Sequence, residues 1–309
     1  MKHKNCNTAL CHMDLVKLME QFGTEAQARQ ILEKLRWPTG ILCPRCDSES
    51  ISRIYDRDQL DCNSCRYRFS VTTGTIFHDS HLSFQKWFLA VFLMTEARKG
   101  ISANQLKRVL GVSYKTAWYL CHRIRAAMAE VNAEQLDGVV EVDEAFVGGN
   151  SHGKGRGAYM INKAIAIGAI QRSGKVRLRA IPNTTKKELH AFIKEVVSDS
   201  AEAIYTDEWR AYRGIGDENT VHKTVNHSKD EWVNGDVHTN TVENVWSLLK
   251  RSIIGSYHKV SVKHFDAYLD ELEFRFNNRE NSFLFRDTLK KLVAADKLPY
   301  KELISKETA

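Results

Sequence analysis

The sequence of 309 residues contains no apolar run long enough to cross a membrane. The stretch from Phe88 to Met94 is apolar throughout, yet it falls far short of the roughly 20 residues that a transmembrane helix needs. The basic opening residues Met1–Cys6 are followed by no apolar core of signal-peptide length. Internal repeats and low-complexity segments are also missing. We therefore expect a cytoplasmic protein with no membrane partner.

The composition points to folded domains and to a polyanionic partner. The chain has 43% hydrophobic and 27% charged residues, values near the average of soluble globular proteins, so disorder is not expected. Its length exceeds one typical domain, which predicts two or three units. The net charge of +7 favours nucleic acid as the partner and, in the cytoplasm, association with the nucleoid.

Seven cysteines are few, but four of them are regularly spaced. Two C-x₂-C pairs, separated by fifteen residues, are formed by Cys43 with Cys46 and by Cys62 with Cys65. This spacing lets two loops present four thiolates to one structural Zn²⁺, and four protein ligands leave no open position for catalysis. A redox role is not expected, because no thioredoxin-like βαβ unit surrounds either pair. Arginines near the pairs are consistent with phosphate contacts and equally with surface charge: Arg45, Arg53, Arg57, Arg66 and Arg68.

Two helical segments follow the cysteines and are joined by a short turn. Residues 103–110 and 116–128 have helical spacing, and Gly111-Val112-Ser113 separates them. This pattern predicts a helix-turn-helix, with an ordinary helical hairpin as the alternative. In the second helix, Ala117, Leu120, Ile124 and Met128 are expected to face inward. The side chains expected to face DNA are Tyr114, Lys115, Thr116, Tyr119, His122, Arg123 and Arg125.

Beyond residue 138 the apolar spacing changes from helical to strand-like. We predict strands at 139–146, 163–170, 175–181 and 201–207, a weaker one at 220–226, and helices at 185–197, 241–253 and 262–278. This order favours a mixed sheet flanked by helices, an α/β fold. The glycine-rich and basic stretch 148–157 is expected to be a loop.

Three acidic residues stand where this fold would bring them together. Asp143 and Asp207 end two predicted strands, and Glu243 begins a predicted helix. Carboxylate oxygens suit Mg²⁺ better than zinc, and a pair of such ions can cut and rejoin phosphodiesters. Other acids nearby are alternatives to these three: Glu141, Glu144, Glu208, Asp230, Glu231 and Asp236.

The helical phase after residue 241 favours Glu243 over its acidic neighbours. Glu243, Ser247 and Lys250 share one face of that helix, at i, i+4 and i+7. A cation at Lys250 would hold a phosphate or a terminal base of DNA, with plain surface charge as the alternative. The spacing does not decide between Asp143 and Glu141, which share one face of their strand. The residues expected in the buried stripe of the helix are Val242, Val245, Trp246, Leu249 and Ile253.

Several long motifs resemble the DDE transposases of bacterial insertion sequences, in the zinc-ribbon ISXO2-like group. The matching stretches are Leu35–Pro38, Cys43–Cys46, Phe69–Phe77, Lys86–Ala90, Glu141–Gly149, Tyr205–Asp207, His238–Arg251, Tyr268–Glu271 and Phe274–Arg279. The resemblance implies a ribonuclease-H-like catalytic core in which Asp143, Asp207 and Glu243 bind Mg²⁺ or Mn²⁺. The loop at 148–157 is less densely basic than in related chains.

Together these features predict a Mg-dependent transposase. It would bind the terminal inverted repeats of its element, cleave a DNA strand and transfer it to target DNA as a homodimer or larger synaptic assembly. The alternatives are a DNA-binding regulator with an inactive core and a nuclease that cuts without joining. The expected organisation is a helical segment at 1–36, a zinc ribbon at 37–78, a helix-turn-helix region at 82–130, a catalytic domain at 138–255 and a helical extension at 256–309.

Overall fold

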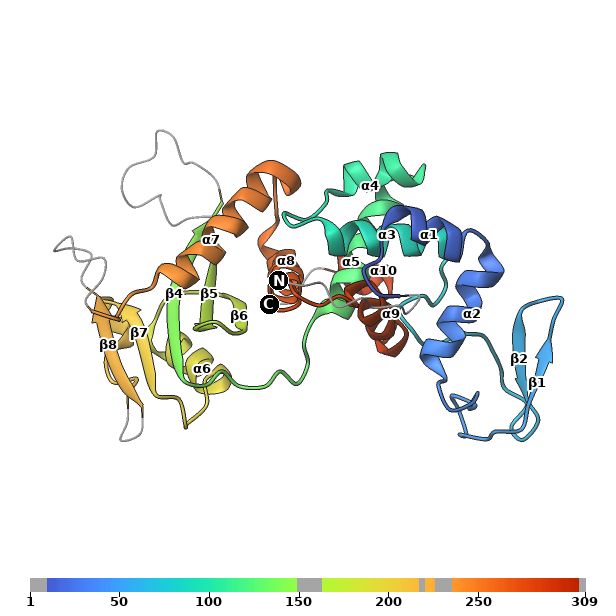
Figure 1. Ribbon diagram of the computed structural model, residues 1–309, viewed down its shortest axis with the longest axis horizontal. Coiled ribbons are helices and arrows are strands. Elements are labelled where there is room, and N and C mark those ends of the chain that lie inside the picture. Colours follow the sequence, from blue (N-terminus) through green and yellow to red (C-terminus); the bar gives the residue numbers. More distant parts are fainter. Residues whose placement is uncertain (1–9, 149–162, 217–219, 226–234, 306–309) are drawn as a thin grey trace. The chain divides into compact units, whose positions relative to one another are not determined.

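A computed structural model describes residues 10–148, 163–216, 220–225 and 235–305 (Figure 1). Most of the predicted loop at 148–157 lies outside these residues. The chain forms two compact units: one contains residues 1–128 together with 280–309, and the other contains residues 129–279. No helix in the described ranges is both long and apolar enough to span a membrane.

The first unit is mainly helical. Its helix α2 begins with a capping box, in which Thr24 and Gln27 bond each other's backbone N–H groups. Phe22, Phe88 and Phe285 pack against one another, so that segments far apart in the sequence share one core. The helices are α1 (Leu15–Phe22), α2 (Glu25–Arg36), α3 (Phe84–Glu96), α4 (Ala103–Leu110), α5 (Tyr114–Met128), α9 (Leu284–Ala294) and α10 (Tyr300–Ile304).

A small antiparallel sheet lies between α2 and α3 in the sequence. Its strands β1 (Ile51–Ile54), β2 (Gln59–Cys62) and β3 (Arg68–Phe69) pair in chain order. Leu60, Phe69 and two of the cysteines are buried at its centre. The Arg36 guanidinium donates to the carbonyls of Ser70, Val71 and Thr73 and so fixes the chain that leaves β3.

The second unit is built on a five-stranded sheet with the order β6-β5-β4-β7-β8. Strands β4, β5 and β6 form an antiparallel meander. On the other side of β4, strand β7 pairs with β4 in parallel, and β8 pairs in parallel with β7. This is the mixed sheet of the ribonuclease-H-like fold, so the predicted fold class is confirmed. The strands are β4 (Val139–Val147), β5 (Ala164–Gln171), β6 (Val176–Ile181), β7 (Ala203–Asp207) and β8 (Val221–Val225).

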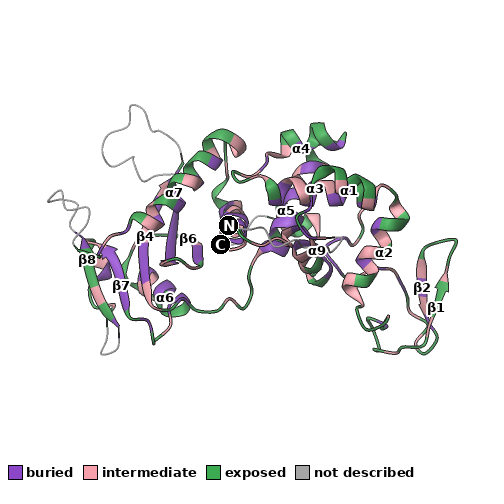
Figure 2. Cartoon of the chain, viewed as in Figure 1, coloured by how far each residue is buried: buried purple, intermediate pink, exposed green. Residues whose placement is uncertain are grey.

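Helices cover both faces of this sheet, as the buried strands in Figure 2 indicate. On β4, Val140 and Val142 pack with helix α6 (Lys186–Val196), whereas Ala145 and Val147 pack with α7 (Asn240–Ser252) and α8 (Phe265–Asn277). Because side chains alternate along a strand, the odd-numbered positions of β4 face α7. Short helical turns complete the unit at Arg210–Tyr212, Ile253–Tyr257 and Val262–His264.

Helix α8 closes the β6 edge of the sheet with side-chain acceptors. Asp266, Glu273 and Asn277 accept the backbone N–H groups of Ala180, Leu178 and Val176 at 2.7–2.8 Å. These bonds replace a neighbouring strand. The residues expected as one extension at 256–309 are therefore divided: α8 belongs to the second unit, and α9 and α10 belong to the first.

Candidate functional site

The parallel pairing of β4 with β7 brings Asp143 and Asp207 to the same part of the sheet. Val139, Val140 and Glu141 pair with Ala203, Ile204 and Tyr205. The same offset, continued for two residues, leads to Asp143 on one strand and Asp207 on the other. Both odd-numbered side chains then point to one face of the sheet. The Asp207 carboxylate also accepts the backbone N–H of Trp209 at 2.9 Å, which fixes the turn after β7.

Helix α7 packs on this face and holds Asp143 through Trp246. The indole Nε1 of Trp246 donates to Asp143 Oδ2 at 3.0 Å. Gly168 is the residue opposite Asp143 on β5, and a Cβ there would lie 2.7 Å from the indole ring. The glycine thus makes room for the ring that bonds the aspartate. Sequence reasoning placed Trp246 only in the buried stripe, although a glycine inside a strand is itself a signal of close approach.

Glu141, the alternative acid on β4, has a structural role. Its side chain is fully buried. The carboxylate accepts the N–H groups of Thr241 and Val242 at the start of α7, the Thr241 hydroxyl, and Nε of Arg172 at 3.0 Å. It therefore caps the helix from the neighbouring strand. Thr239, which stands at the N-cap position of α7, makes no side-chain cap bond.

The charges of Asp207 and Glu243 act on the carboxyl group of Asp143 in the same direction as its burial. Burial raises the pKa of Asp143 to about 6, and the charges of Asp207 and Glu243 add to that rise. Burial likewise raises the pKa of Glu144 to about 8 on the opposite face, beside Tyr212. A bound cation would relieve the repulsion around Asp143, and oxygen donors fit Mg²⁺. In the described ranges, the four cysteines are the only group of three or more possible metal ligands whose ligand atoms all lie within 4.8 Å of one another, so Asp143, Asp207 and Glu243 stand farther apart than that.

The remaining site candidates fall into three groups. Glu243 is half-buried near the start of α7 and accepts the Thr239 hydroxyl at 3.1 Å, while Lys250 is exposed nearer the end of the helix. Asp236 is exposed, and its backbone carbonyl accepts a hydrogen bond from Arg172 at 2.6 Å. Asp230 and Glu231 lie outside the described residues. The buried stripe of α7 is confirmed for Val242, Val245, Trp246 and Leu249.

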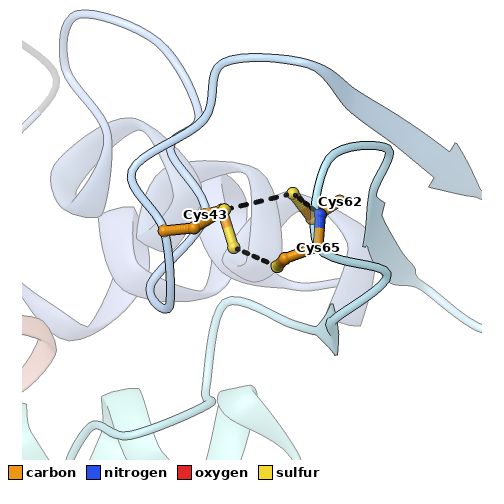
Figure 3. Close-up of side chains that lie close together, drawn as sticks. Cys43, Cys62 and Cys65 are labelled. Atoms are coloured by element: carbon orange, nitrogen blue, oxygen red, sulfur yellow. Dashed lines mark hydrogen bonds between the residues drawn. The ribbon is translucent and has the colours of Figure 1, made fainter.

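The four spaced cysteines of the first unit converge (Figure 3). Sγ of Cys43 lies 3.6 Å from that of Cys65, and Sγ of Cys46 lies 3.6 Å from that of Cys62. Thiolates bound to one zinc at about 2.3 Å stand roughly 3.8 Å apart, so these thiols fit the ion. Backbone N–H groups of Cys65 and Ser64 lower the pKa of the Cys62 thiol to about 6. The thiolate form that a metal requires is thus favoured there.

Three of the arginines near the cysteines have carboxylate partners. Arg53 donates to Glu33 with both terminal nitrogens, and Arg68 donates to both carboxylate oxygens of Asp61. Nε of Arg57 lies 3.8 Å from a carboxylate oxygen of Asp56. The guanidinium of Arg45 lies 5.9 Å from the ring centroid of Tyr67. Surface pairing therefore accounts for Arg53, Arg57 and Arg68, and Arg45 and Arg66 are the candidates for phosphate contact.

The helix-turn-helix forms as predicted, but its second helix does not expose the expected residues. The inward positions Ala117, Leu120, Ile124 and Met128 are buried. His122, Arg123 and Arg125 are buried as well, at 1–3% exposure, so the prediction that these three face DNA is wrong. Arg123, for example, donates to the carbonyl of His78 and packs on the ring of Trp87. Packing against α3 and α9 surrounds the second half of α5, which a single helix pattern cannot reveal.

Comparisons with known proteins match both units. Residues 135–277 match the family described as ISXO2-like transposase domain, and residues 23–68 match the transposase zinc-ribbon domain. An uncharacterised protein in the transposable element ISH50 of Halobacterium salinarum is 30% identical over 278 residues, which cover 83% of this chain and 92% of the relative. An uncharacterised transposase-like protein of Haemophilus influenzae is 31% identical over 106 residues, or 34% of this chain and 84% of the relative.

The solved structures that resemble the chain include the Mos1 strand transfer complex. The TM-score is 0.29 at 12% identity, and the match covers 67% of this chain and 75% of that chain. The ISH50 relative, which is 30% identical over 83% of this chain, carries the family assignment together with the two matched domains.

Proposed function

Because the chain belongs to the ISXO2-like transposase family, we propose that it cuts DNA at the ends of an insertion sequence and joins them to target DNA. The observation that supports this most strongly is the continued β4–β7 register, which puts Asp143 and Asp207 at corresponding positions of neighbouring strands, on the sheet face that α7 and its Glu243 cover. Burial raises the pKa of Asp143 to about 6, and the charges of Asp207 and Glu243 add to that rise. The matched family residues 135–277 contain all three.

In this proposal the three carboxylates hold two divalent ions, Mg²⁺ or Mn²⁺. Such ions activate an attacking hydroxyl and stabilise the leaving oxygen of a phosphodiester. Asp143 is held in place by the Trp246 indole, and Glu243 by the Thr239 hydroxyl. These bonds orient the acids before DNA arrives, which reduces the reorganisation that metal binding requires.

We assign Lys250 to the DNA rather than to the metals. It is exposed on α7, seven residues after Glu243. In the described part of the chain its ammonium group makes no ion pair with a carboxylate. An ammonium there would neutralise a phosphate near the cleaved strand. Its loss would weaken binding and reduce the dependence of that binding on salt.

The first unit would bring the DNA to this site. The cysteines Cys43, Cys46, Cys62 and Cys65 would bind one structural Zn²⁺, and the helix-turn-helix would recognise the terminal inverted repeats. Joining two ends of one element requires at least two active sites. A homodimer or larger assembly on DNA therefore belongs to the proposal.

The test is a cleavage and joining assay with the full-length chain. The DNA is a duplex taken from sequence that flanks the gene, with a target plasmid and Mg²⁺ or Mn²⁺. We expect Asp207→Asn to abolish cleavage and leave binding of the duplex intact. The matched control is Asp236→Asn, which alters an exposed acid outside the site and should retain wild-type activity.

The outcomes separate this proposal from its alternatives. Binding of the duplex without cleavage by the wild-type chain would indicate a regulator with an inactive core. Cleavage without joined products would indicate a nuclease. Equal activity of Asp207→Asn and wild type would exclude the proposed site.

A further inference from the structure

The burial of His122, Arg123 and Arg125 leaves only one end of α5 open to a partner. Ser113, Tyr114 and Lys115 are exposed at the first turn, and Tyr114 is 50% exposed. On α4, Lys107 and Arg108 are exposed as well. In helix-turn-helix proteins the start of the second helix meets base edges, while the first helix crosses the phosphate backbone. Here, Ser113, Tyr114 and Lys115 are exposed where the second helix begins. Lys107 and Arg108 are exposed on the first helix.

A residue from the far end of the chain packs against this first turn. Nζ of Lys115 lies 4.4 Å from the centre of the Tyr300 ring. The same ring meets Tyr119 edge-on, with centroids 5.3 Å apart, and the ring of Trp118 at 6.5 Å. The Tyr119 hydroxyl donates to the carbonyl of Leu298. The segment that begins α10 is thus fixed on one side of α5.

These contacts restrict the side chain of Lys115, and lysine is among the residue types with the most rotamer freedom. A lysine side chain loses rotamer entropy when it is immobilised on DNA. The Tyr300 ring restricts the ammonium before DNA binds, so that less of this entropy is lost on binding. In the described part of the chain, no comparable aromatic contact is recorded for Lys107 or Arg108.

We propose that Lys115 reads a base at the element end and that Tyr300 is the positioning residue that holds it for reading. Tyr114 contacts the neighbouring step, and Lys107 and Arg108 bind phosphates. The C-terminal segment would then belong to the sequence-reading surface. This inference rests on the proposed function, because it assumes that the first unit binds specific DNA.

The first experiment selects duplexes from a randomised pool with the full-length wild-type chain. The selected sequence then serves as the probe for Lys115→Ala, Tyr300→Ala and Tyr300→Phe. The control variant is Lys301→Ala, an exposed neighbour of Tyr300 on α10. Affinities are measured for the selected duplex and for duplexes changed at each base pair, over a range of salt concentrations.

We expect Lys115→Ala to bind the selected duplex roughly 5- to 150-fold more weakly and to lose preference at one or two adjacent base pairs. Tyr300→Ala should relax preference at the same base pairs, with a loss of about two- to fivefold and an unchanged salt dependence. Tyr300→Phe keeps the ring and should behave as wild type. Lys107→Ala and Arg108→Ala should weaken all duplexes alike, each lowering the salt slope by about 0.9.

Three results would overturn the inference. One is a Tyr300→Ala variant that matches Lys301→Ala. Another is tighter DNA binding by Tyr300→Ala, which would mean that the ring keeps Lys115 from the DNA. The third is a Lys115→Ala variant that weakens all sequences equally and lowers the salt slope, since Lys115 would then contact phosphate. If the wild-type chain selects no sequence at all, the proposed recognition of element ends fails instead.

Discussion

Gly168 lies directly opposite Asp143 in the β4–β5 ladder, and its missing side chain makes room for the indole of Trp246. That indole donates to Asp143 at 3.0 Å. Gly168, which has no side chain, thereby allows the contact that fixes the position of Asp143. The first two predictions concern this arrangement.

Gly168→Ala should displace the indole, because the new Cβ would lie 2.7 Å from the ring and 2.9 Å from Leu178. We expect a loss of about 1–3 kcal/mol in the free energy of unfolding. Cleavage should fall by on the order of 100-fold, since small misplacements at reacting centres are costly. The control is Gly174→Ala, whose close contact is with the flexible side chain of Gln171. Equal cleavage by the two variants would contradict the prediction.

Trp246→Phe should keep most of the ring and remove its N–H donor. That donor lowers the pKa of Asp143, which burial raises to about 6, so the variant should have a higher Asp143 pKa. Protons compete with metal for the carboxylate, and Mg²⁺ affinity should therefore rise with pH through a midpoint that lies higher in the variant. Calorimetric titration with Mg²⁺ between pH 5 and about 8 measures both midpoints. Coincident midpoints would show that the indole does not act on Asp143.

Glu141→Gln should destabilise the second unit by about 3 kcal/mol, because a buried charge that caps α7 and pairs with Arg172 is lost. Urea unfolding monitored by circular dichroism measures this. The control is Glu134→Gln, which removes an exposed ion pair with Lys175 and should leave the urea midpoint at its wild-type value, because solvent screens such pairs. A small effect at both positions would argue against the cap.

The protein without Mg²⁺ or Mn²⁺ should become more stable as the pH falls from 8 to 5. Burial raises the pKa of Asp143 to about 6, of Asp270 to about 7 and of Glu144 to about 8. The folded state then binds more protons than the unfolded state in this window, so stability is lost as pH rises. Thermal unfolding of the zinc-loaded protein without added Mg²⁺ or Mn²⁺ should show a higher Tm at pH 5.5 than at pH 8, by at least about 3 °C. Asp270→Asn, which lies outside the metal site, should reduce the slope, and a Tm that rises with pH would refute the prediction.

Removal of zinc should affect the first unit alone. We expect a chelator, or Cys62→Ser, to release the ion and disorder the ribbon, because its small core includes two of the ligands themselves. DNA binding should be lost while Mg²⁺ binding by the second unit persists. Cys121→Ser is the control, since Cys121 is buried in α5 away from the ribbon and its variant should keep one zinc per chain. Loss of zinc from both variants would exclude the four-cysteine site.

Much of the fold was predictable because its signals are local. Alternating apolar residues located the strands of the second unit to within one or two residues, and helical phase separated Glu243 from the buried stripe of α7. The paired cysteine spacing anticipated the convergence of four thiols. Each of these signals depends on residues that are neighbours in sequence or share one periodic element.

The roles of Glu141 and of the second half of α5 were not predictable in this way. Glu141 and Asp143 have the same side-chain type on the same strand face, and only the placement of α7 gives one of them a helix to cap. His122, Arg123 and Arg125 read as a DNA-facing set, because the helices that bury them lie elsewhere in the sequence. A polar side chain does not reveal whether water, DNA or another helix will surround it.

The sequence by itself determined which residues can do chemistry: three acids on two strands and a helix, four cysteines in two pairs, and basic side chains on the second helix of the helix-turn-helix. Asp143 was expected at a strand end, but β4 continues to Val147. Tertiary structure decided which of them are used and how. The β4–β7 register places Asp143 toward Asp207, Gly168 admits the indole that holds Asp143, and Tyr300 meets Lys115 from nearly the other end of the chain. The reason is physical: periodicity fixes the face on which a side chain lies, but only packing between distant segments fixes its neighbours.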